Sequence, residues 1–287
     1  MEILILGLVR GALYSLISVG FVLVFSVGGV LNLAHGTYYM LGAYLTFIFY
    51  SLVLHGASTG GLIFSVFLAL VCVGLIAGVI YYILLRPNIQ SVVYVMVLTL
   101  ALALFFSEVM SLFFGVSGTS VPSLIEGNTK IGNLKVVNQQ LILLPITMFI
   151  LPGLWLFLKK TRIGQGIDAV AQQRTAAILM GVDANRALLI TYSLSAIMAG
   201  LAGALIAPVS SVVPDMWLFP LIKAFAIAIL GGIGSLLGSI IASFLLGYAE
   251  IFTSFLIGEH LSETLALVII VVVLLIKPSG ILGQKIR

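Results

Sequence analysis

Apolar segments of membrane-spanning length follow one another along almost the whole chain, and this succession limits the folds open to it. Only 8% of the 287 residues are charged and 62% are hydrophobic, whereas a soluble domain carries roughly 25% charged residues. Because each membrane helix needs about 20 mainly apolar residues, the spans leave no room for a separate soluble catalytic domain. We predict an all-α, polytopic membrane protein with one transmembrane domain over residues 1–287.

Residues that favour turns divide the chain into its spans. Breaks rich in glycine, proline, asparagine and serine interrupt the apolar runs, as turns and loops should. About eight or nine transmembrane helices fit between these breaks at the length that a bilayer requires. We expect them at residues 4–28, 37–54, 61–85, 91–114, 140–158, 187–207, 218–232, 236–257 and 262–277.

Stripes of small residues spaced four apart predict where these helices pack closely. Lipid is as apolar as the helices, so close backbone contact and polar contacts must hold them together. Pro145 and Pro152 fall inside the fifth span, where each favours a kink. The stripes are Gly7, Gly11 and Ser15; Gly74 and Gly78; Ser195, Ala199 and Gly203; and Gly234, Gly238 and Ala242.

Positively charged residues in short loops indicate which side of the membrane each loop occupies. Arg86, the basic stretch 159–186 and the carboxyl-terminal cations fall on one side, whereas Lys130 and Lys135 fall on the other among several acidic residues. The first side is predicted to be cytoplasmic, with the carboxyl terminus inside and the amino terminus outside. A re-entrant break at residues 26–40, in place of a loop, would reverse the amino terminus.

A polar, basic segment at residues 159–186, here called the island, interrupts the apolar chain with five cations against two anions. Gly166 precedes a stretch with helical spacing, so we expect one helix over residues 167–180, with Asp168 in its first turn and Gly181 at its end. Such a segment offers a soluble partner a surface through which to move the spans. A helix that only lies on lipid phosphates would show the same pattern.

The longest loop on the opposite side covers residues 115–139. Within it, residues 130–137 alternate in a way that predicts a small β-hairpin turning at Gly132 and Asn133. A hairpin of this size is too small to be a domain. It would serve as a lid or as a docking surface for a partner outside the cell.

Polar residues near Asn32 stand where the flanking sequence is apolar. Asn32 and His35 are three residues apart and share a face if the segment is helical, and Gly36 is one of several neighbouring glycines that favour a broken helix. One interpretation is a translocation path or gate lined by these side chains. The other, weighed equally, is a pair of hydrogen-bonding groups that holds helices together.

Three charged residues, Glu108, Lys223 and Glu250, fall at similar predicted depth, a turn or two inside the outer ends of their spans. An ion pair between Lys223 and one of the glutamates would lower the cost of burying both charges. We expect a structural bridge, and an outer gate that opens when the bridge rearranges is the alternative.

No motif for an enzyme is present in the sequence. His35, His55 and His260 are far apart and lack the spacing of a metal site, and neither a Gly-x-Ser-x-Gly nor a His-Glu-x-x-His motif occurs. The glycine-rich run at Gly231, Gly232, Gly234 and Ser235 lacks the Gly-Lys-Ser/Thr of a phosphate-binding loop and predicts a tight turn. The net charge of +4 belongs mainly to loop residues beside spans, so it does not indicate nucleic-acid binding.

Four segments, in this order and over nearly the whole chain, resemble one known family. They are LNLAHGTYYMLGAY (31–44), TRIGQGIDAVAQQRTAAILMGVDANR (161–186), YSLSAIMAGLAGALIAP (192–208) and KAFAIAILGGIGSLLGSIIASFLLGYAE (223–250). The chain is similar through them to the LivH-type permeases of branched-chain amino acid ABC importers. In such proteins a basic residue often replaces Asp168, and acidic residues often replace Gln173 and Thr175.

This resemblance implies a non-enzymatic transport subunit in a prokaryotic cell (inner) membrane. Its partners would be a second, LivM-type permease, two cytoplasmic ATP-binding subunits that carry the ATP and Mg²⁺, and an extracytoplasmic protein that delivers leucine, isoleucine or valine. The chain itself would hold no cofactor or metal. We expect the translocation path or gate at Asn32, His35, Gly36, Glu108, Lys223 and Glu250 because of the polar groups at membrane depth there. The resemblance further implies coupling to the ATPases through Gly164, Ala169, Gln172, Arg174, Ala176, Met180 and Gly181, and the turn residues Gly231, Gly232, Gly234 and Ser235 match the late motif of the family.

Other functions remain open at this point. Related permeases carry urea and short amides. A secondary transporter driven by protons or sodium would use His35, Glu108 and Glu250 as a relay, and it would keep working without ATP. A channel would pass solute downhill without partners, and a membrane-embedded enzyme would need a catalytic set that the sequence lacks.

Overall fold

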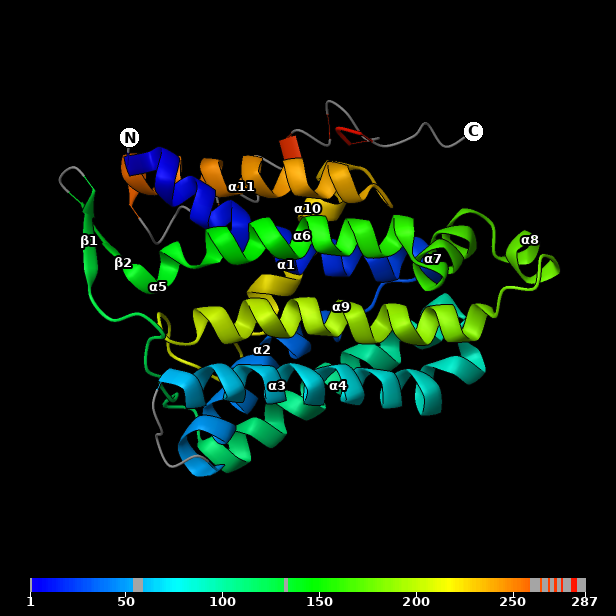
Figure 1. Ribbon diagram of the computed structural model, residues 1–287, viewed down its shortest axis with the longest axis horizontal. Coiled ribbons are helices and arrows are strands. Elements are labelled where there is room, and N and C mark those ends of the chain that lie inside the picture. The colour runs from blue at the N-terminus through cyan, green and yellow to red at the C-terminus, as the bar shows by residue number, and fades with distance from the viewer. Residues whose placement is uncertain are drawn as a thin grey trace.

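The computed structural model describes residues 2–53, 59–131, 134–258 and 280–282, together with positions 264, 268, 271, 272 and 275. Its long helices run along one direction, side by side (Figure 1). In chain order the helices are α1 (Glu2–Gly28), α2 (His35–Phe47), α3 (Thr59–Ile80), α4 (Val92–Phe114), α5 (Asn138–Leu141), α6 (Leu143–Lys160), α7 (Arg162–Gln172), α8 (Arg174–Leu179), α9 (Ala184–Ile206), α10 (Leu218–Gly231) and α11 (Leu236–Ile257).

Six of the described helical segments are long and apolar enough to cross a membrane, and α10 is a shorter apolar helix. The predicted span 37–54 is α2 followed by a wider, π-helical stretch, Ile48–Val53. The predicted span 262–277 lies outside the continuously described residues. The six segments are Ile3–Gly28, Thr59–Asn88, Val92–Phe114, Asn138–Lys160, Ala184–Ile206 and Leu236–Leu256.

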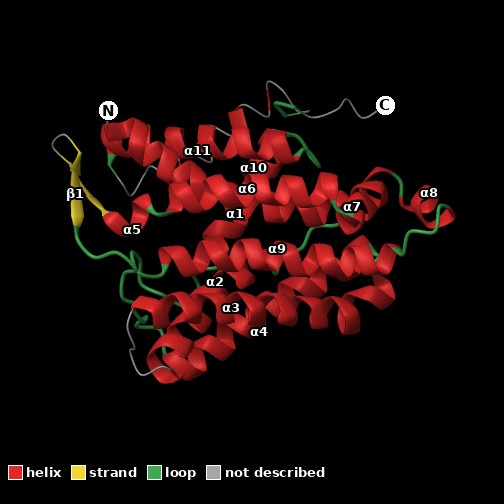
Figure 2. Cartoon of the chain, viewed as in Figure 1, coloured by secondary structure: helices red, strands yellow, loops and turns green. Residues whose placement is uncertain are grey.

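The predicted hairpin is confirmed by two short antiparallel strands, β1 (Asn128–Ile131) and β2 (Leu134–Val137). Ile131 is paired with Leu134, and the predicted turn residues, Gly132 and Asn133, lie outside the described residues. The two strands form the one sheet in the described part of the chain (Figure 2).

The two ends of the bundle carry different elements of the chain. The start of α1 lies at the end that carries the hairpin, and α7 and α8 lie at the opposite end (Figure 1); these are called the hairpin end and the island end. Ile281 N donates to the carbonyl of Leu230 (2.7 Å), which ties residues 280–282 to the island-end terminus of α10. The amino-terminal helix start and this segment therefore lie at opposite ends, as the distribution of cations predicts.

α2 lies inside the bundle, with eleven of its thirteen residues buried. It packs against α9 so closely that a side chain at Gly203 would meet the carbonyl of Tyr39, and one at Gly42 would meet the backbone of Gly200. Small residues allow two helix backbones to approach in this way. The stripe Ser195, Ala199 and Gly203, predicted from the sequence, is buried along its length.

The other predicted stripes also lie at helix contacts. On α1, Gly7 lies under the ring of Tyr248 and Gly11 under that of Phe244, both from α11, and on α3 Gly74 faces Ile197 of α9. One detail was wrong. Gly234 does not belong to the stripe of the eighth span, because it lies in the turn before α11 with a φ of 84°.

The chain between α1 and α2 is a re-entrant break. Leu33 N donates to Thr99 Oγ1 (3.1 Å), and Ala34 N donates to Asn32 Oδ1 (3.1 Å). Thr99 is the eighth residue of α4, about 10 Å inside that helix at 1.5 Å per residue. The chain nevertheless reverses direction here, so the break does not move the amino terminus to the island end.

A second break, residues 207–217, connects α9 with α10. Val212 exchanges two backbone hydrogen bonds of 2.9 Å with Thr119, and Ser107 Oγ of α4 donates to the carbonyl of Pro214 (2.8 Å). α10 therefore begins inside the bundle, as α2 does. The two helix starts meet where Gly36 lies against the carbonyl of Trp217.

The fifth predicted span is divided into α5 and α6. Pro145, expected inside the span, is the third residue of α6, whereas Pro152 is inside that helix. Pro145 has no N–H to donate to the carbonyl of Leu141, four residues earlier, and its ring crowds that carbonyl. The interruption at Ile142 follows from this missing hydrogen bond.

We predict that Gly203→Ala destabilises the protein by about 1–3 kcal/mol, because the added methyl group overpacks the α2–α9 contact. Gly153→Ala is the matched control, since a Cβ at Gly153 has no atom within 4 Å; it gains up to about 1 kcal/mol from helix propensity. Thermal unfolding of the two purified variants in detergent measures the difference. Equal melting temperatures would contradict the close α2–α9 contact.

Candidate functional site

His35, the first residue of α2, connects three helices. Its side chain is fully buried. Nε2 lies 2.9 Å from the carbonyl of Ile17 on α1, and Nδ1 lies 3.2 Å from Ser195 Oγ on α9. A carbonyl only accepts, so in the neutral ring Nε2 donates and Nδ1 accepts from Ser195. Phe21 packs edge-on at 5.5 Å between ring centroids, and this geometry favours the structural interpretation of His35.

Asn32 does not share a helical face with His35, because residues 31–34 are not helical. Its Oδ1 supports the turn into α2 by accepting from Ala34 N (3.1 Å). Its Nδ2 is buried and has no hydrogen-bond partner among the described residues. Asn32 therefore holds the break together through Oδ1, and its side chain also interacts with the hydroxyl of Tyr38.

Further buried hydroxyls without a described hydrogen-bond partner lie close to the start of α2. They belong to Thr37 and Tyr38 in its first turn, to Tyr192 on α9 and to Tyr81, the first residue of the π-helical stretch Tyr81–Leu85 that follows α3. The rings of Tyr81 and Tyr192 are 5.1 Å apart, and Tyr192 interacts electrostatically with both other tyrosines. Buried polar atoms are normally paired, so a water molecule or a polar group of a substrate would satisfy them.

The predicted ion pair of Lys223 is confirmed with Glu250. Lys223 Nζ lies 3.1 Å from Glu250 Oε2 and donates to the hydroxyl of Tyr14 (2.8 Å), and Tyr14 in turn donates to Glu250 Oε2 (2.5 Å). Arg10 Nη1 approaches Glu250 Oε1 at 3.9 Å. We call these four residues the ionic network. It joins α1, α10 and α11; Lys223 and Glu250 are buried, where an isolated charge would be costly, whereas the Arg10 side chain is 45% exposed.

Glu108 is not part of this network. It is exposed on α4 and makes no ion pair with any residue that the structure describes. α4 lies across the bundle from α11 (Figure 1), so equal depth does not bring the two glutamates together. Conversely, Arg10 and Tyr14 were not predicted. Two features of the sequence could have revealed them: the four-residue spacing that puts both on one face of α1, and the charge of Arg10 inside an apolar span.

The glycine-rich run forms the predicted tight turn at the island end. Gly232 and Gly234 have φ values of 100° and 84°, which favour glycine. Gly231 lies against Gly238 of the following helix. Ser235 caps α11 by accepting from Gly238 N (3.0 Å), so its side chain has a structural partner.

The island contains two helices, and the prediction of one helix over residues 167–180 was wrong. α7 begins at Arg162, because Thr161 Oγ1 accepts from Gly164 N (3.0 Å) and so provides the cap that Gly166 cannot. Gln173 is extended, with φ −157°, and separates α7 from α8. The predicted stop at Gly181 is confirmed by its φ of 85°.

Asp168 was expected in a first helical turn, where it would complement the helix dipole, and that expectation was wrong. The residue lies in the middle of α7 and accepts a hydrogen bond from Lys159 Nζ at 2.8 Å. Asp183 has the capping role instead, since it accepts from the backbone N–H groups of Asn185 and Arg186 at the start of α9.

The coupling residues implied by the resemblance differ in exposure. Gly164 is buried against Phe157 and Leu158, whereas Met180 is 86% exposed. Leu179, which was not predicted, is 82% exposed, so α8 ends in an apolar tip that projects beyond the bundle (Figure 1). Of the others, Ala169, Arg174 and Ala176 are half-buried, and Gln172 and Gly181 are exposed.

Comparison with known proteins identifies the family. The family described as "Branched-chain amino acid transport system / permease component" matches residues 3–276. The chain belongs to this family. It is a multi-pass membrane permease, a subunit of an ABC transport system and not itself an enzyme.

Relatives match the chain along nearly its full length. The high-affinity branched-chain amino acid transport system permease protein LivH of Escherichia coli (strain K12) is 28% identical over 97% of this chain and 94% of its own. The permease protein BraD of Pseudomonas aeruginosa is 29% identical over 98% of this chain and 95% of its own. A probable LivH of Methanocaldococcus jannaschii is 26% identical over 96% of this chain and 90% of its own. No solved structure matches.

We predict that Lys223→Met destabilises this permease by about 3–5 kcal/mol, because it leaves the buried Glu250 carboxylate without its closest cation. Adding Glu250→Gln recovers most of the loss, since the unpaired charge is then removed as well. Glu108→Gln is the control and changes stability by less than about 0.5 kcal/mol at its exposed position. Thermal unfolding in detergent gives all three values. A Lys223→Met protein of normal stability that no longer transports would assign the network to a gate.

Proposed function

We propose that this permease carries leucine, isoleucine or valine into the cytoplasm of a prokaryotic cell. Its similarity to LivH and BraD, both named as branched-chain amino acid permeases, supports this substrate class. A second, LivM-type permease completes the membrane unit, two ATP-binding subunits bind it from the cytoplasm, and an extracytoplasmic binding protein delivers the amino acid at the hairpin end. The importer lies in the cell (inner) membrane.

The apolar tip of α8 is the structural observation that supports the coupling to cytoplasmic ATP-binding subunits. Leu179 and Met180 are exposed at the end of the molecule that the distribution of cations assigns to the cytoplasm. Large exposed apolar side chains next to charged ones are typical of a protein contact. Ile167 and Val170 of α7 and Ala177 of α8 are buried, so both helices are anchored in the bundle while the exposed tip of α8 can enter a groove on an ATPase.

The free energy for transport comes from the partner subunits. The turn from Gly231 to Ser235 is not followed by the Gly-Lys-Ser/Thr of a phosphate-binding loop, and the Ser235 side chain caps α11. ATP and Mg²⁺ therefore bind the partners. Hydrolysis there, transmitted through the island, shifts the bundle between its outward and inward openings.

The translocation path runs beside the first turn of α2. Asn32, Tyr38 and Tyr192 have buried polar atoms without described hydrogen-bond partners there, and these suit a solute with a charged or polar end. Gly36 keeps the starts of α2 and α10 in contact. His35 and the ionic network hold the surrounding helices in place, and Glu108 lies outside this region.

We predict that the double variant Leu179→Ser, Met180→Ser folds and inserts normally but loses its ATPase. Each lost apolar contact weakens binding about tenfold or more, whereas folding is unaffected because both side chains are exposed. Co-purification of ATP-binding subunits and uptake of radiolabelled leucine measure the effect. Val116→Ser, which removes a side chain 78% exposed at the hairpin end, is the matched control.

Full ATPase recruitment by the double variant would overturn the coupling role of the island. The substrate is tested separately with the unaltered importer. Excess isoleucine or valine should suppress leucine uptake, and urea or acetamide should not. Uptake of urea or acetamide in place of leucine would overturn the substrate class, and uptake that persists after ATP depletion but collapses with the ion gradient would overturn the energy source.

A further inference from the structure

The start of α2 lies at membrane depth. His35, its first residue, is bonded to the carbonyl of Ile17, which is near the middle of the 27-residue α1. The first turn of α2 holds no acidic residue, so the helix itself does not neutralise the positive end of its dipole. In membrane transporters, helix starts of this kind face the anionic groups of substrates. The polar side chains around the helix start determine what it can bind.

Hydrogen-bond donors without partners gather at this helix start. The amide of Asn32 is held there by its Oδ1, which accepts from Ala34 N (3.1 Å), and its Nδ2 has no hydrogen-bond partner among the described residues. The hydroxyl of Tyr38 also lacks one and lies beside the Asn32 side chain. The hydroxyl of Tyr192, likewise without a described partner, interacts electrostatically with Tyr38 and lies 3.9 Å from where a Cβ on Gly28 would be. Each of the three side chains is at most 2% exposed.

The chemistry of these groups suits a carboxylate and does not suit an ammonium group. An amide N–H only donates, and a tyrosine hydroxyl can donate to an anion, whereas an ammonium group is itself a donor and needs an anion when it is buried. The one buried carboxylate in the described part of the chain, that of Glu250, is paired with Lys223. His35 adds no donor, because both of its ring nitrogens are engaged. Neutral donors at a helix start are typical of sites that bind an anion.

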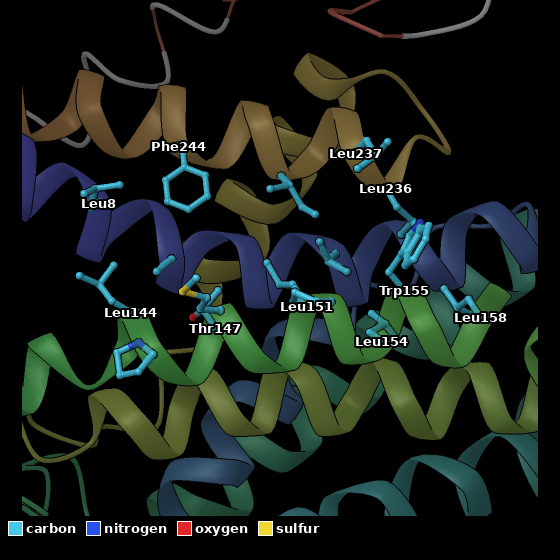
Figure 3. A pocket seen from close by; sticks show the side chains of 16 residues that line it. Leu8, Leu144, Thr147, Leu151, Leu154, Trp155, Leu158, Leu236, Leu237 and Phe244 are labelled. Carbon is cyan, nitrogen blue, oxygen red and sulfur yellow. The ribbon is translucent and has the colours of Figure 1, made fainter. Parts of the chain in front are cut away.

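The wide groove along α6 offers no comparable set of donors. It lies between α6 and α11, over α1 (Figure 3), and its volume is about 810 Å³. Apart from Thr147 and Trp155, every side chain that lines it is hydrocarbon or thioether. Burying a carboxylate there without enough hydrogen bonds would be costly. The groove therefore does not suit the charged end of an amino acid.

We propose that the α-carboxylate of the transported amino acid binds at the start of α2, on Asn32 Nδ2 and on the hydroxyls of Tyr38 and Tyr192. This subsite rests on the proposed function, because it assigns one end of the proposed substrate. The donors are buried in this structure, so the carboxylate reaches them only when the surrounding helices have moved apart. Tyr192 lies on α9, which contacts both α7 and α8. Movement of the island therefore opens and closes the subsite.

Two phenylalanine variants remove the donors and leave the fold intact. Tyr38→Phe and Tyr192→Phe each delete a buried hydroxyl without a described partner, so the melting temperature of the purified complex should stay the same or rise. Leucine uptake into vesicles that contain the complete importer, at saturating binding protein, should fall about tenfold in each variant. Tyr44→Phe is the matched control. Its buried hydroxyl donates to the carbonyl of Val212 (3.3 Å), so this variant should lose stability and keep the uptake rate of the folded complex.

Two analogues of leucine, each with one of its charges, identify the group that binds. Isocaproate has the carboxylate without the amine, and isoamylamine has the amine without the carboxylate. In the absence of binding protein, isocaproate should raise the melting temperature of the permease complex and isoamylamine should not. Asn32→Asp keeps the acceptor for Ala34 N but replaces the donor with a negative charge, so protection by isocaproate should be lost.

Normal uptake by the double variant Tyr38→Phe, Tyr192→Phe would overturn the subsite. Loss of stability with an unchanged uptake rate would overturn it too, because the hydroxyls would then hold structural water. Protection by isoamylamine, or by neither analogue, would overturn the choice of a carboxylate. These results leave the proposed function standing, which fails if the unaltered importer takes up no leucine.

Discussion

The absence of water inside a bilayer governs this architecture, because each backbone N–H and C=O at membrane depth needs a partner in the protein. The chain breaks its helices at two such places and satisfies them with side chains. Thr99 accepts from Leu33 N in the first break, and Ser107 donates to the carbonyl of Pro214 in the second. These two hydroxyls of α4 help α2 and α10 to begin inside the bundle. The start of α2 in turn places His35 between α1 and α9.

The ionic network holds α10 against α1 and α11, as the close α2–α9 contact holds α2 against α9. α10 is too short to be held by length of contact alone, and its one charged residue, Lys223, is 5% exposed. Coordination by Tyr14 and Glu250 compensates the cost of burying that charge and fixes α10 to α1 and α11. Polar contacts of defined geometry thus add to the apolar packing that holds both helices in the bundle.

Features that depend on length, local spacing or charge balance could be predicted from the sequence. Apolar runs gave the spans, Gly132 and Asn133 indicated the hairpin, and a buried Lys223 required a carboxylate. The sequence does not show which helices are neighbours in the cross-section of the bundle. Glu108 and Glu250 therefore looked equivalent, although only Glu250 lies beside Lys223. Arg10 and Tyr14 carried a readable signal in their spacing. The extended Gln173 that divides the island has no such signal, because its conformation depends on how α7 and α8 meet the bundle.

The same contacts suggest how movement at the island would reach the proposed path. α7 packs against α1, α6 and α9, and α9 packs against α2. Contacts between glycines leave no soft side chain to absorb a displacement, so a shift of α9 at Gly200 and Gly203 moves Gly42 and Tyr39 with it. Ser195, on the same face of α9, would carry His35 in the same direction through its hydrogen bond. In the proposed mechanism, an ATPase that moves α8 would act through these contacts on the start of α2, where the side chains of Asn32 and Tyr38 are buried.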